Sequence, residues 1–174
     1  MEYIDVLDKK GNKTGKSKPY PDIHKDGDWH RAVHIWFINS KGEILLQQRT
    51  PTMKIYGNML CASASGHVSA GESSETSALR EIEEEVGIRI SKKKLKWIGE
   101  VTRNEILNNG TFLDKEYNDV YIVKMDLGID NLKSNTEVKS FKWVPVNGFL
   151  KMVKENNSNL VPHPKGYKLL LSFL

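Results

Sequence analysis

The sequence predicts an α/β fold in which a mixed β-sheet lies between helices. Extended segments occupy much of the chain before residue 66 and return between residues 95 and 144. One amphipathic helix of about three to four turns separates these two groups of strands. Two short helices follow the second group. A single sheet whose faces are covered by the helices accounts for this order of elements.

The length and composition favour one globular domain. We expect one domain over residues 1–174, in which residues 1–30 form an extension made of a hairpin and a loop. Hydrophobic residues make up 39% and charged residues 28%, which is ordinary for a soluble protein. No apolar run approaches the ~18 residues of a membrane span, and the first residues do not resemble a signal peptide. We therefore expect a cytoplasmic protein that does not bind membranes.

The charge indicates which partners to expect, and the cysteine content excludes two kinds of structural cross-link. The net charge of +4 favours anionic partners such as phosphates. The lysines are scattered and no stripe of arginine and aromatic residues is present, so nucleic acid is not expected as a partner. The single cysteine, Cys61, excludes an internal disulfide and a cysteine-based zinc site.

The first segments indicate a hairpin followed by a loop. Residues 3–7 and 13–17 are extended and flank a turn that contains glycine and asparagine. Residues 19–30 are rich in proline, glycine and aspartate, which predicts a loop. This loop delivers His24 and His30, and paired polar residues on a loop are often functional.

The middle of the chain is extended up to the long helix. Residues 32–38 and 43–49 predict two strands joined by a turn, and residues 58–65 predict a third that leads into the helix. The later elements are strands at 95–104, 119–127 and 138–144, a turn at 108–110, and helices at 147–154 and 164–174.

The long helix follows a glycine-rich loop. Ser73 or Ser74 can cap its start, and Gly87 can end it in a left-handed conformation. Leu79, Ile82 and Val86 recur at helical spacing, so they predict its buried stripe.

Three glutamates form a second stripe on this helix. Glu81, Glu84 and Glu85 fall at i, i+3 and i+4, so their carboxylates gather on one side, whereas Glu83 points elsewhere. Each such like-charged pair destabilises a helix by roughly 0.2–0.5 kcal/mol. A hard divalent cation would offset this repulsion, because Mg²⁺ and Mn²⁺ prefer carboxylate oxygens and keep positions open for phosphates.

These residues are part of a longer pattern that resembles the Nudix box. The pattern is Gly66, Glu72, Arg80, Glu81, Glu84, Glu85 and Gly87, with aliphatic residues at Ile82 and Ile88. Every specified position of that box is present at its expected spacing. The resemblance implies the Nudix fold, an α/β/α sandwich. It also implies hydrolysis of a diphosphate linkage, usually in a nucleoside diphosphate joined to another group.

The resemblance also implies roles for individual residues. Glu81, Glu84 and Glu85 resemble the ligands of Mg²⁺ or Mn²⁺, and the carbonyl group of Gly66 resembles a further ligand. Glu72 and Arg80 resemble the pair that ties the loop to the helix. One of the acids is expected to orient or deprotonate the attacking water. Separately, Arg49 and Lys54 lie where a basic side chain could bind a substrate phosphate.

Further segments resemble the Nudix branch that contains the type 1 isopentenyl diphosphate isomerases. They are residues 4–8, 24, 29–34, 46–49, 65–67 and 116–121. In that branch a second metal site uses three histidines and a glutamate, and the matching positions here are His24, His30, His67 and Glu116. The resemblance therefore implies a second divalent ion, and such donors suit Mn²⁺, Zn²⁺ or Fe²⁺.

Two departures count against isomerase chemistry. The cysteine that isomerases require corresponds to Ser65, and a further glutamate corresponds to Asn118. An amide cannot exchange a proton as a carboxylic acid does. We therefore expect a Nudix hydrolase that acts on a small-molecule diphosphate. The alternatives are an isopentenyl-diphosphate isomerase and a non-catalytic binding module with the same fold.

The sequence leaves the substrate open. Sugar nucleotides, dinucleoside polyphosphates, coenzyme diphosphates, nucleoside triphosphates, prenyl diphosphates and capped RNA are all candidates. We expect specificity to lie in loops at residues 19–28 and 107–115. The identity of the general base, the number of ions and the oligomeric state, a homodimer included, stay open as well.

Overall fold

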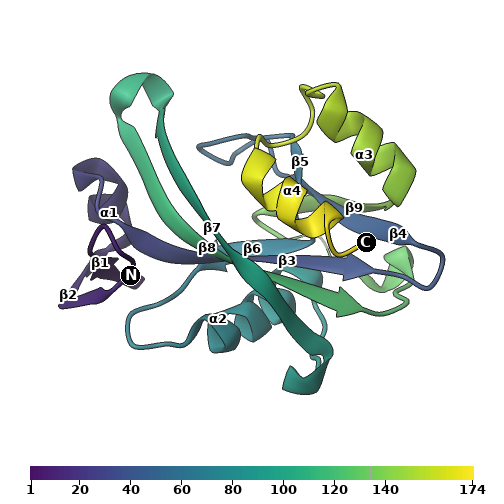
Figure 1. Ribbon diagram of the computed structural model, residues 1–174, viewed down its shortest axis with the longest axis horizontal. Coiled ribbons are helices and arrows are strands. Elements are labelled where there is room, and N and C mark those ends of the chain that lie inside the picture. The colour runs from purple at the N-terminus through teal and green to yellow at the C-terminus, as the bar shows by residue number, and fades with distance from the viewer. Residues whose placement is uncertain (134) are drawn as a thin grey trace.

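The computed structural model describes residues 1–133 and 135–174. It confirms the predicted α/β class, with a seven-stranded mixed sheet between helices (Figure 1). The strands of this sheet are β3 (His30–Ile38), β4 (Glu43–Arg49), β5 (Leu60–Cys61), β6 (Ala64–His67), β7 (Leu95–Leu107), β8 (Phe112–Lys124) and β9 (Val138–Pro145). The main path runs β5-β4-β3-β8-β7, while β6 pairs with β3 and β9 pairs with β4. Among the strand pairs that the described residues form in this sheet, β3–β8 is parallel and the others are antiparallel.

Helices cover both faces of the sheet because β3 is apolar on both sides (Figure 1). Trp36 and Ile38 share one core with α3 (Val146–Lys154) and α4 (Pro164–Leu171). Val33, Ile35 and Phe37 face the other way and share a core with α2 (Ser74–Glu81). Alternate residues of a strand point to opposite faces, so the continuous apolar run of β3 serves two cores at once.

The edge of β3 is shared by two strands, and this corrects the single strand expected at residues 58–65. β4 pairs with β3 only at Ile38, after which β6 takes over the same edge between Ala32 and Ile35. The chain therefore breaks into β5, which pairs with β4, and β6, which pairs with β3. Ser63 fills the gap, because its hydroxyl accepts the Phe37 N–H at 2.8 Å and donates to the Leu45 carbonyl at 2.6 Å.

The β7–β8 hairpin is longer than expected, with 13 residues in each strand. Its turn lies at Asn108–Gly110 as predicted, and all three residues have positive φ. The expected loop at 107–115 is wrong beyond residue 111, since β8 begins at Phe112 rather than near residue 119. The outer half of the hairpin projects from the sheet beside α1 (Tyr20–Asp26) (Figure 1).

The N-terminal hairpin is present as β1 (Tyr3–Leu7) and β2 (Lys13–Pro19). The loop expected at residues 19–30 is instead mostly the helix α1. A proline in the first turn is compatible with a helix start, and Gly27 ends the helix with φ of 68°. Burial of Ile23 and His24 fixes this helix against the body.

The remaining helices differ from expectation only at their ends. α3 begins at Val146 after Pro145, so Asn147 lies inside it rather than capping it, and α4 ends at Leu171 rather than at residue 174. Short 3₁₀ turns are found at Lys92–Lys94 and Ile129–Asn131. Within the described residues, no helix is long and apolar enough to cross a membrane.

Candidate active site

The loop and helix that carry the acids are built as their sequence indicates. Ser73 caps α2 by accepting the Thr76 N–H at 3.1 Å. The helix then continues as a π-helical turn over Ile82–Val86 and ends at Gly87, which has φ of 80°. Such π turns are frequent at functional sites, and this one carries two of the three predicted ligands.

The buried stripe of this helix anchors the acids to the sheet. Ile82 and Val86 are fully buried and Leu79 is partly buried, all in the core shared with β3. Ala78, which the periodicity argument did not single out, is fully buried with them. The stripe therefore sets how the neighbouring glutamates approach the sheet.

The three glutamates differ in their exposure. Glu84 is exposed, whereas Glu81 and Glu85 are buried. Glu85 accepts the Ser65 N–H at 2.7 Å and the Gln47 side-chain amide at 3.2 Å. Burial raises the pKa of Glu81 to about 7 and that of Glu85 to about 8. Both acids would ionise readily only with a cation beside them.

Arg80 holds these acids in place. Its Nη1 atom donates to Glu81 at 2.7 Å and to Glu84 at 3.2 Å, while its Nη2 atom donates to the His67 carbonyl at 3.0 Å. Glu72 lies 3.6 Å from the Arg80 Nε atom and accepts the Ser77 hydroxyl at 2.6 Å. Loop and helix are thus joined through Ser77 as well as through the expected pair.

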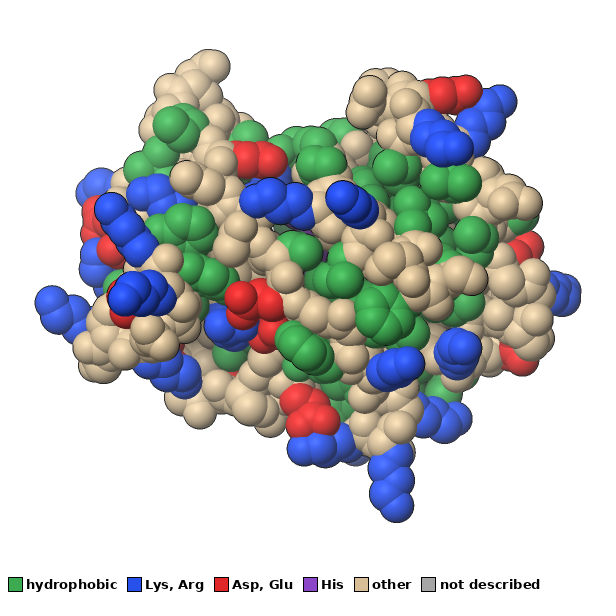
Figure 2. Space-filling model, in the orientation of Figure 1, with side chains coloured by type: hydrophobic (Ala, Val, Ile, Leu, Met, Phe, Trp, Pro, Cys, Tyr) green, Lys and Arg blue, Asp and Glu red, His purple; other side chains and the backbone are tan. Residues whose placement is uncertain are grey.

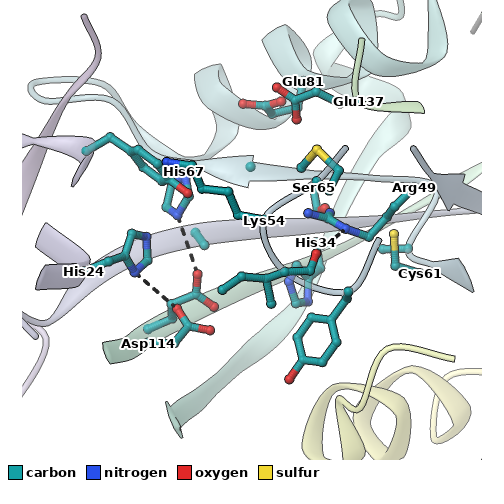
Figure 3. A pocket seen from close by; sticks show the side chains of 18 of the residues that line it. His24, His34, Arg49, Lys54, Cys61, Ser65, His67, Glu81, Asp114 and Glu137 are labelled. Carbon is teal, nitrogen blue, oxygen red and sulfur yellow. Dashed lines mark hydrogen bonds and ion pairs between the residues drawn. The ribbon is translucent and has the colours of Figure 1, made fainter. Parts of the chain in front are cut away.

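The predicted phosphate-binding residues share one cavity with these acids. The cavity has a volume of about 860 Å³ and is lined by Glu81, Glu84, Arg49 and Lys54. Figure 3 shows Arg49, Lys54 and Ser65 around this cavity. On the face shown in Figure 2, Lys and Arg side chains alternate with acidic and hydrophobic ones and form no continuous basic patch.

Glu137 also lines this cavity and was missed by the sequence argument. It precedes β9, and its charge helps to raise the pKa of Glu85 after the larger effects of burial and Glu81. The nearby Asn135 side-chain amide donates to the Glu84 carbonyl at 2.8 Å, which ties this segment to the box helix. No local motif marks Glu137, because only the fold brings it there.

His24, His30, His67 and Glu116 come together from four elements, α1, β3, β6 and β8. The centroids of the three imidazole rings are 4.8 to 5.3 Å apart. The Oε1 atom of Glu116 lies 3.6 Å from His30 Nε2 and 3.7 Å from His67 Nε2. The pairing register explains this, since His30 lies opposite Glu116 and Ala32 opposite His67.

The histidines present free nitrogen atoms to the cluster. The Nδ1 atoms of His24 and His30 lie 3.3 and 3.0 Å from backbone carbonyls, so an N–H there leaves Nε2 as an acceptor. Among the described residues, both Nε2 atoms are buried without a hydrogen-bond partner. Burial lowers the pKa of His24 to about 4 and that of His67 to about 3, so both are neutral at pH 7. Neutral, oriented imidazoles fit a divalent ion.

Asp114 joins this cluster and was also missed. Its Oδ1 atom lies 3.7 Å from His24 Nδ1, and one ligand atom from each of His30, Asp114 and Glu116 fits within 4.8 Å. Its spacing of two residues from Glu116 on a strand was the available signal. The prediction of a loop over residues 107–115 conceals this signal, because a loop has no regular alternation of side chains.

Comparisons with known proteins agree with this architecture. Residues 28–163 match the NUDIX domain. Nudix hydrolase 3 of Arabidopsis thaliana is 37% identical over 167 residues, which are 93% of this chain but 22% of that protein. An isopentenyl-diphosphate Delta-isomerase 2 of Photorhabdus laumondii is 33% identical over 143 residues, 82% of this chain and 77% of that protein. The chain thus spans about a fifth of the Arabidopsis relative.

Solved structures share the fold at low sequence identity. DR0079 from Deinococcus radiodurans has a TM-score of 0.72 at 18% identity, covering 99% of this chain and 100% of that one. The NUDIX domain of Shewanella oneidensis NrtR, solved with ADP ribose, has a TM-score of 0.59 at 16% identity, covering 82% and 86%. With the match over residues 28–163, these findings show that the chain belongs to the Nudix family.

Proposed function

We propose that this protein hydrolyses a diphosphate linkage in a small molecule with Mg²⁺ or Mn²⁺ held by Glu81, Glu84 and Glu85. The observation that supports this most is the shared cavity, which Glu81 and Glu84 line together with two basic side chains, Arg49 and Lys54. Glu85 lies directly behind it, bonded to the Ser65 N–H. An anion with two phosphates fits such a site, because the basic groups bind it directly while the acids bind it through a cation.

Different side chains have different roles in the proposed hydrolysis. Arg80 orients Glu81 and Glu84, and the Gly66 carbonyl is the further ligand that the family resemblance implies. Arg49 and Lys54 bind the phosphates and hold them in line. A bound Mg²⁺ or Mn²⁺ would polarise a phosphoryl oxygen and lower the pKa of the attacking water. Glu137 and the box acids are the candidates for the general base, because all of them lie at this cavity or directly behind it.

We also propose a second divalent ion at His24, His30, His67 and Glu116. Three imidazoles and a carboxylate suit Zn²⁺, Mn²⁺ or Fe²⁺ better than Mg²⁺. The two unpartnered Nε2 atoms among the described residues support this proposal.

Isomerisation of isopentenyl diphosphate is the second candidate, since several relatives, the Photorhabdus protein among them, carry that name. The local geometry disfavours it. Asn118 is buried and donates to the Glu116 Oε2 atom at 3.1 Å, so it offers no titratable proton. Ser65 lies opposite His34 in the β3–β6 pair, and a hydroxyl is a far weaker acid than a thiol.

The test is a panel of diphosphate compounds assayed for phosphate or nucleotide release with Mg²⁺ and with Mn²⁺. ADP-ribose belongs on the panel because it was bound in a structure of the same fold. Sugar nucleotides, dinucleoside polyphosphates and prenyl diphosphates complete it. Hydrolysis that depends on the metal and is lost in Glu84→Gln supports the proposal. Tight binding without turnover across the panel would instead indicate a binding module.

A further inference from the structure

Two buried carboxylates face the histidine cluster from one strand. Asp114 and Glu116 are two residues apart on β8, so their side chains share a face of the sheet. Asp114 is 5% exposed and Glu116 is 8% exposed. Two like charges at such depth are costly unless a positive charge lies between or beside them.

Arg103 lies beside Asp114, and unpaired atoms elsewhere in the cluster mark where a further positive charge belongs. Among the described residues, Asp114 Oδ1, His24 Nε2 and His30 Nε2 are buried without a hydrogen-bond partner. An unsatisfied buried polar atom costs about 1–3 kcal/mol, so three in one cluster need an explanation. His30 belongs both to the group of three imidazoles and to the group with Asp114 and Glu116, which makes it the centre of the cluster.

We infer that Asp114 is a ligand of the ion held by His24, His30, His67 and Glu116. Three imidazoles and two carboxylates supply the donors that a divalent cation needs, and Arg103 offsets part of the charge of Asp114 from its other side. This set of three nitrogen and two oxygen donors suits Zn²⁺, Mn²⁺ or Fe²⁺. Asp114 thus supplies a second carboxylate on the strand where Asn118 offers only an amide.

A purely structural role for Asp114 explains less of the geometry. The Oδ2 atom of Asp114 lies 3.0 Å from Arg103 Nε, so one oxygen is engaged. Arg103 already has another anionic partner, because its Nη2 atom donates to Glu105 at 2.6 Å. The pairing with Arg103 leaves the Oδ1 atom of Asp114 free. Ligating carboxylates are commonly held in this way by an outer partner on their second oxygen.

The inference rests on the proposed second ion but not on hydrolysis, so binding is the measurement. Zn²⁺ is titrated calorimetrically into the full chain with excess Mg²⁺ present, because Mg²⁺ competes for the carboxylate site but poorly for imidazole. Four proteins are compared: the wild type, Asp114→Asn, Glu116→Gln and Glu105→Gln. Glu105→Gln is the matched control, since it removes a carboxylate from Arg103 without touching the histidine cluster.

We expect Asp114→Asn and Glu116→Gln each to weaken Zn²⁺ binding by at least ~10-fold, the loss that even an outer partner of a metal ligand can cause. Glu105→Gln should stay near the wild-type affinity. If Glu116→Gln weakens Zn²⁺ binding and Asp114→Asn does not, Asp114 is not a ligand, although the ion site itself is supported. Equal loss in Asp114→Asn and Glu105→Gln would mean that Asp114 acts only through Arg103, and a wild type that binds no Zn²⁺ would overturn the site itself.

A second measurement needs no variant. Crystals of the wild-type protein soaked in Zn²⁺ would locate the ion by anomalous scattering. We expect a distance of about 2.0–2.2 Å from the ion to an Asp114 oxygen. An ion bound by the histidines with Asp114 beyond hydrogen-bonding distance would contradict the assignment even if Asp114→Asn failed to fold.

Discussion

The carboxylate of Glu81 lies directly against the α-carbon of Gly66, so that a Cβ atom at position 66 would overlap it. We therefore predict that Gly66→Ala displaces Glu81 and lowers turnover on the order of 10²-fold, the cost that a misplacement of about 1 Å can have. The rate and its Mg²⁺ dependence should be measured on the best substrate of the panel. Gly148→Ala in α3 is the control, since its nearest contact is Val144 at 3.4 Å. Wild-type turnover in Gly66→Ala would contradict the proposed role of Glu81 as a metal ligand.

The burial of Glu85 predicts a pH dependence of stability. Its pKa is raised to about 8 in the folded protein, so the folded state holds the proton more tightly than the unfolded state. Stability from this group is complete below about pH 4.5 and is lost as the pH rises towards 8, by at most about 1.4 kcal/mol per pH unit. Chemical denaturation of the metal-free protein should show this decline.

Glu85→Gln should make that dependence flatter, because the amide is neutral at every pH. It should fold normally and yet lose most turnover, as should Glu84→Gln. Saturating Mg²⁺ should flatten the profile of the wild type too, since a cation favours the ionised acid. An identical decline in Glu85→Gln and the wild type would show that another group is responsible.

The basic residues of the cavity should act on substrate binding. We predict that Arg49→Ala and Lys54→Ala each raise KM about 10- to 100-fold, which corresponds to a lost charge-assisted hydrogen bond of about 1.5–3 kcal/mol. Lys54 is exposed, so its effect should be the smaller and should weaken with salt. Steady-state kinetics with Lys151→Ala as an exposed control would test this. An unchanged KM would place the phosphates elsewhere.

The protein should not interconvert isopentenyl and dimethylallyl diphosphate. Each acid-base group contributes roughly 10²–10⁴-fold to such a reaction, and Ser65 and Asn118 supply neither. Incubation with isopentenyl diphosphate and metal in deuterated water, followed by NMR, should show no deuterium incorporation. Incorporation at enzyme-like rates would overturn this prediction. If none occurs, Ser65→Cys with Asn118→Glu asks whether only these two groups were missing.

Because the Ser63 hydroxyl bridges the gap between β3 and β4, we predict that its loss strongly lowers the stability of the fold. Ser63→Ala would leave the Phe37 N–H and the Leu45 carbonyl without partners, at about 1–3 kcal/mol for each buried group. Denaturant unfolding should show this loss, while Ser172→Ala on the exposed C-terminal turn should change little. A small effect would mean that water replaces the hydroxyl.

Local patterns predicted the parts of the fold that depend on local physics. The cap at Ser73, the stop at Gly87 and the turn at Asn108–Gly110 all follow from nearby residues. The predictions at residues 19–30 and 58–65 were wrong because tertiary contacts decided them. Burial of Ile23 favours a helix where proline and glycine indicated a loop, and a shared strand edge divides β5 from β6.

The same distinction between local patterns and tertiary contacts applies to the candidate site. The box residues were identifiable because one helix and its loop carry them at fixed spacing. Asp114 and Glu137 were not, since each belongs to an element that contacts the site only after folding. The sequence resemblance to isomerases named the histidines. The register of β3, β6 and β8 brings His30, His67 and Glu116 together, and α1 adds His24, so that the ring centroids lie within 5.3 Å of one another.

The alternating directions of the side chains along β6 limit the sequence changes that this strand can accept. Ser65 and His67 point to the histidine side of the strand, while Gly66 between them faces Glu81 on the helix side. Loss or gain of one residue within β6 would exchange these directions, placing a side chain against Glu81 and removing His67 from its cluster. Both proposed metal sites would fail together. Within β6, related chains should therefore differ by substitution and not by insertion or deletion.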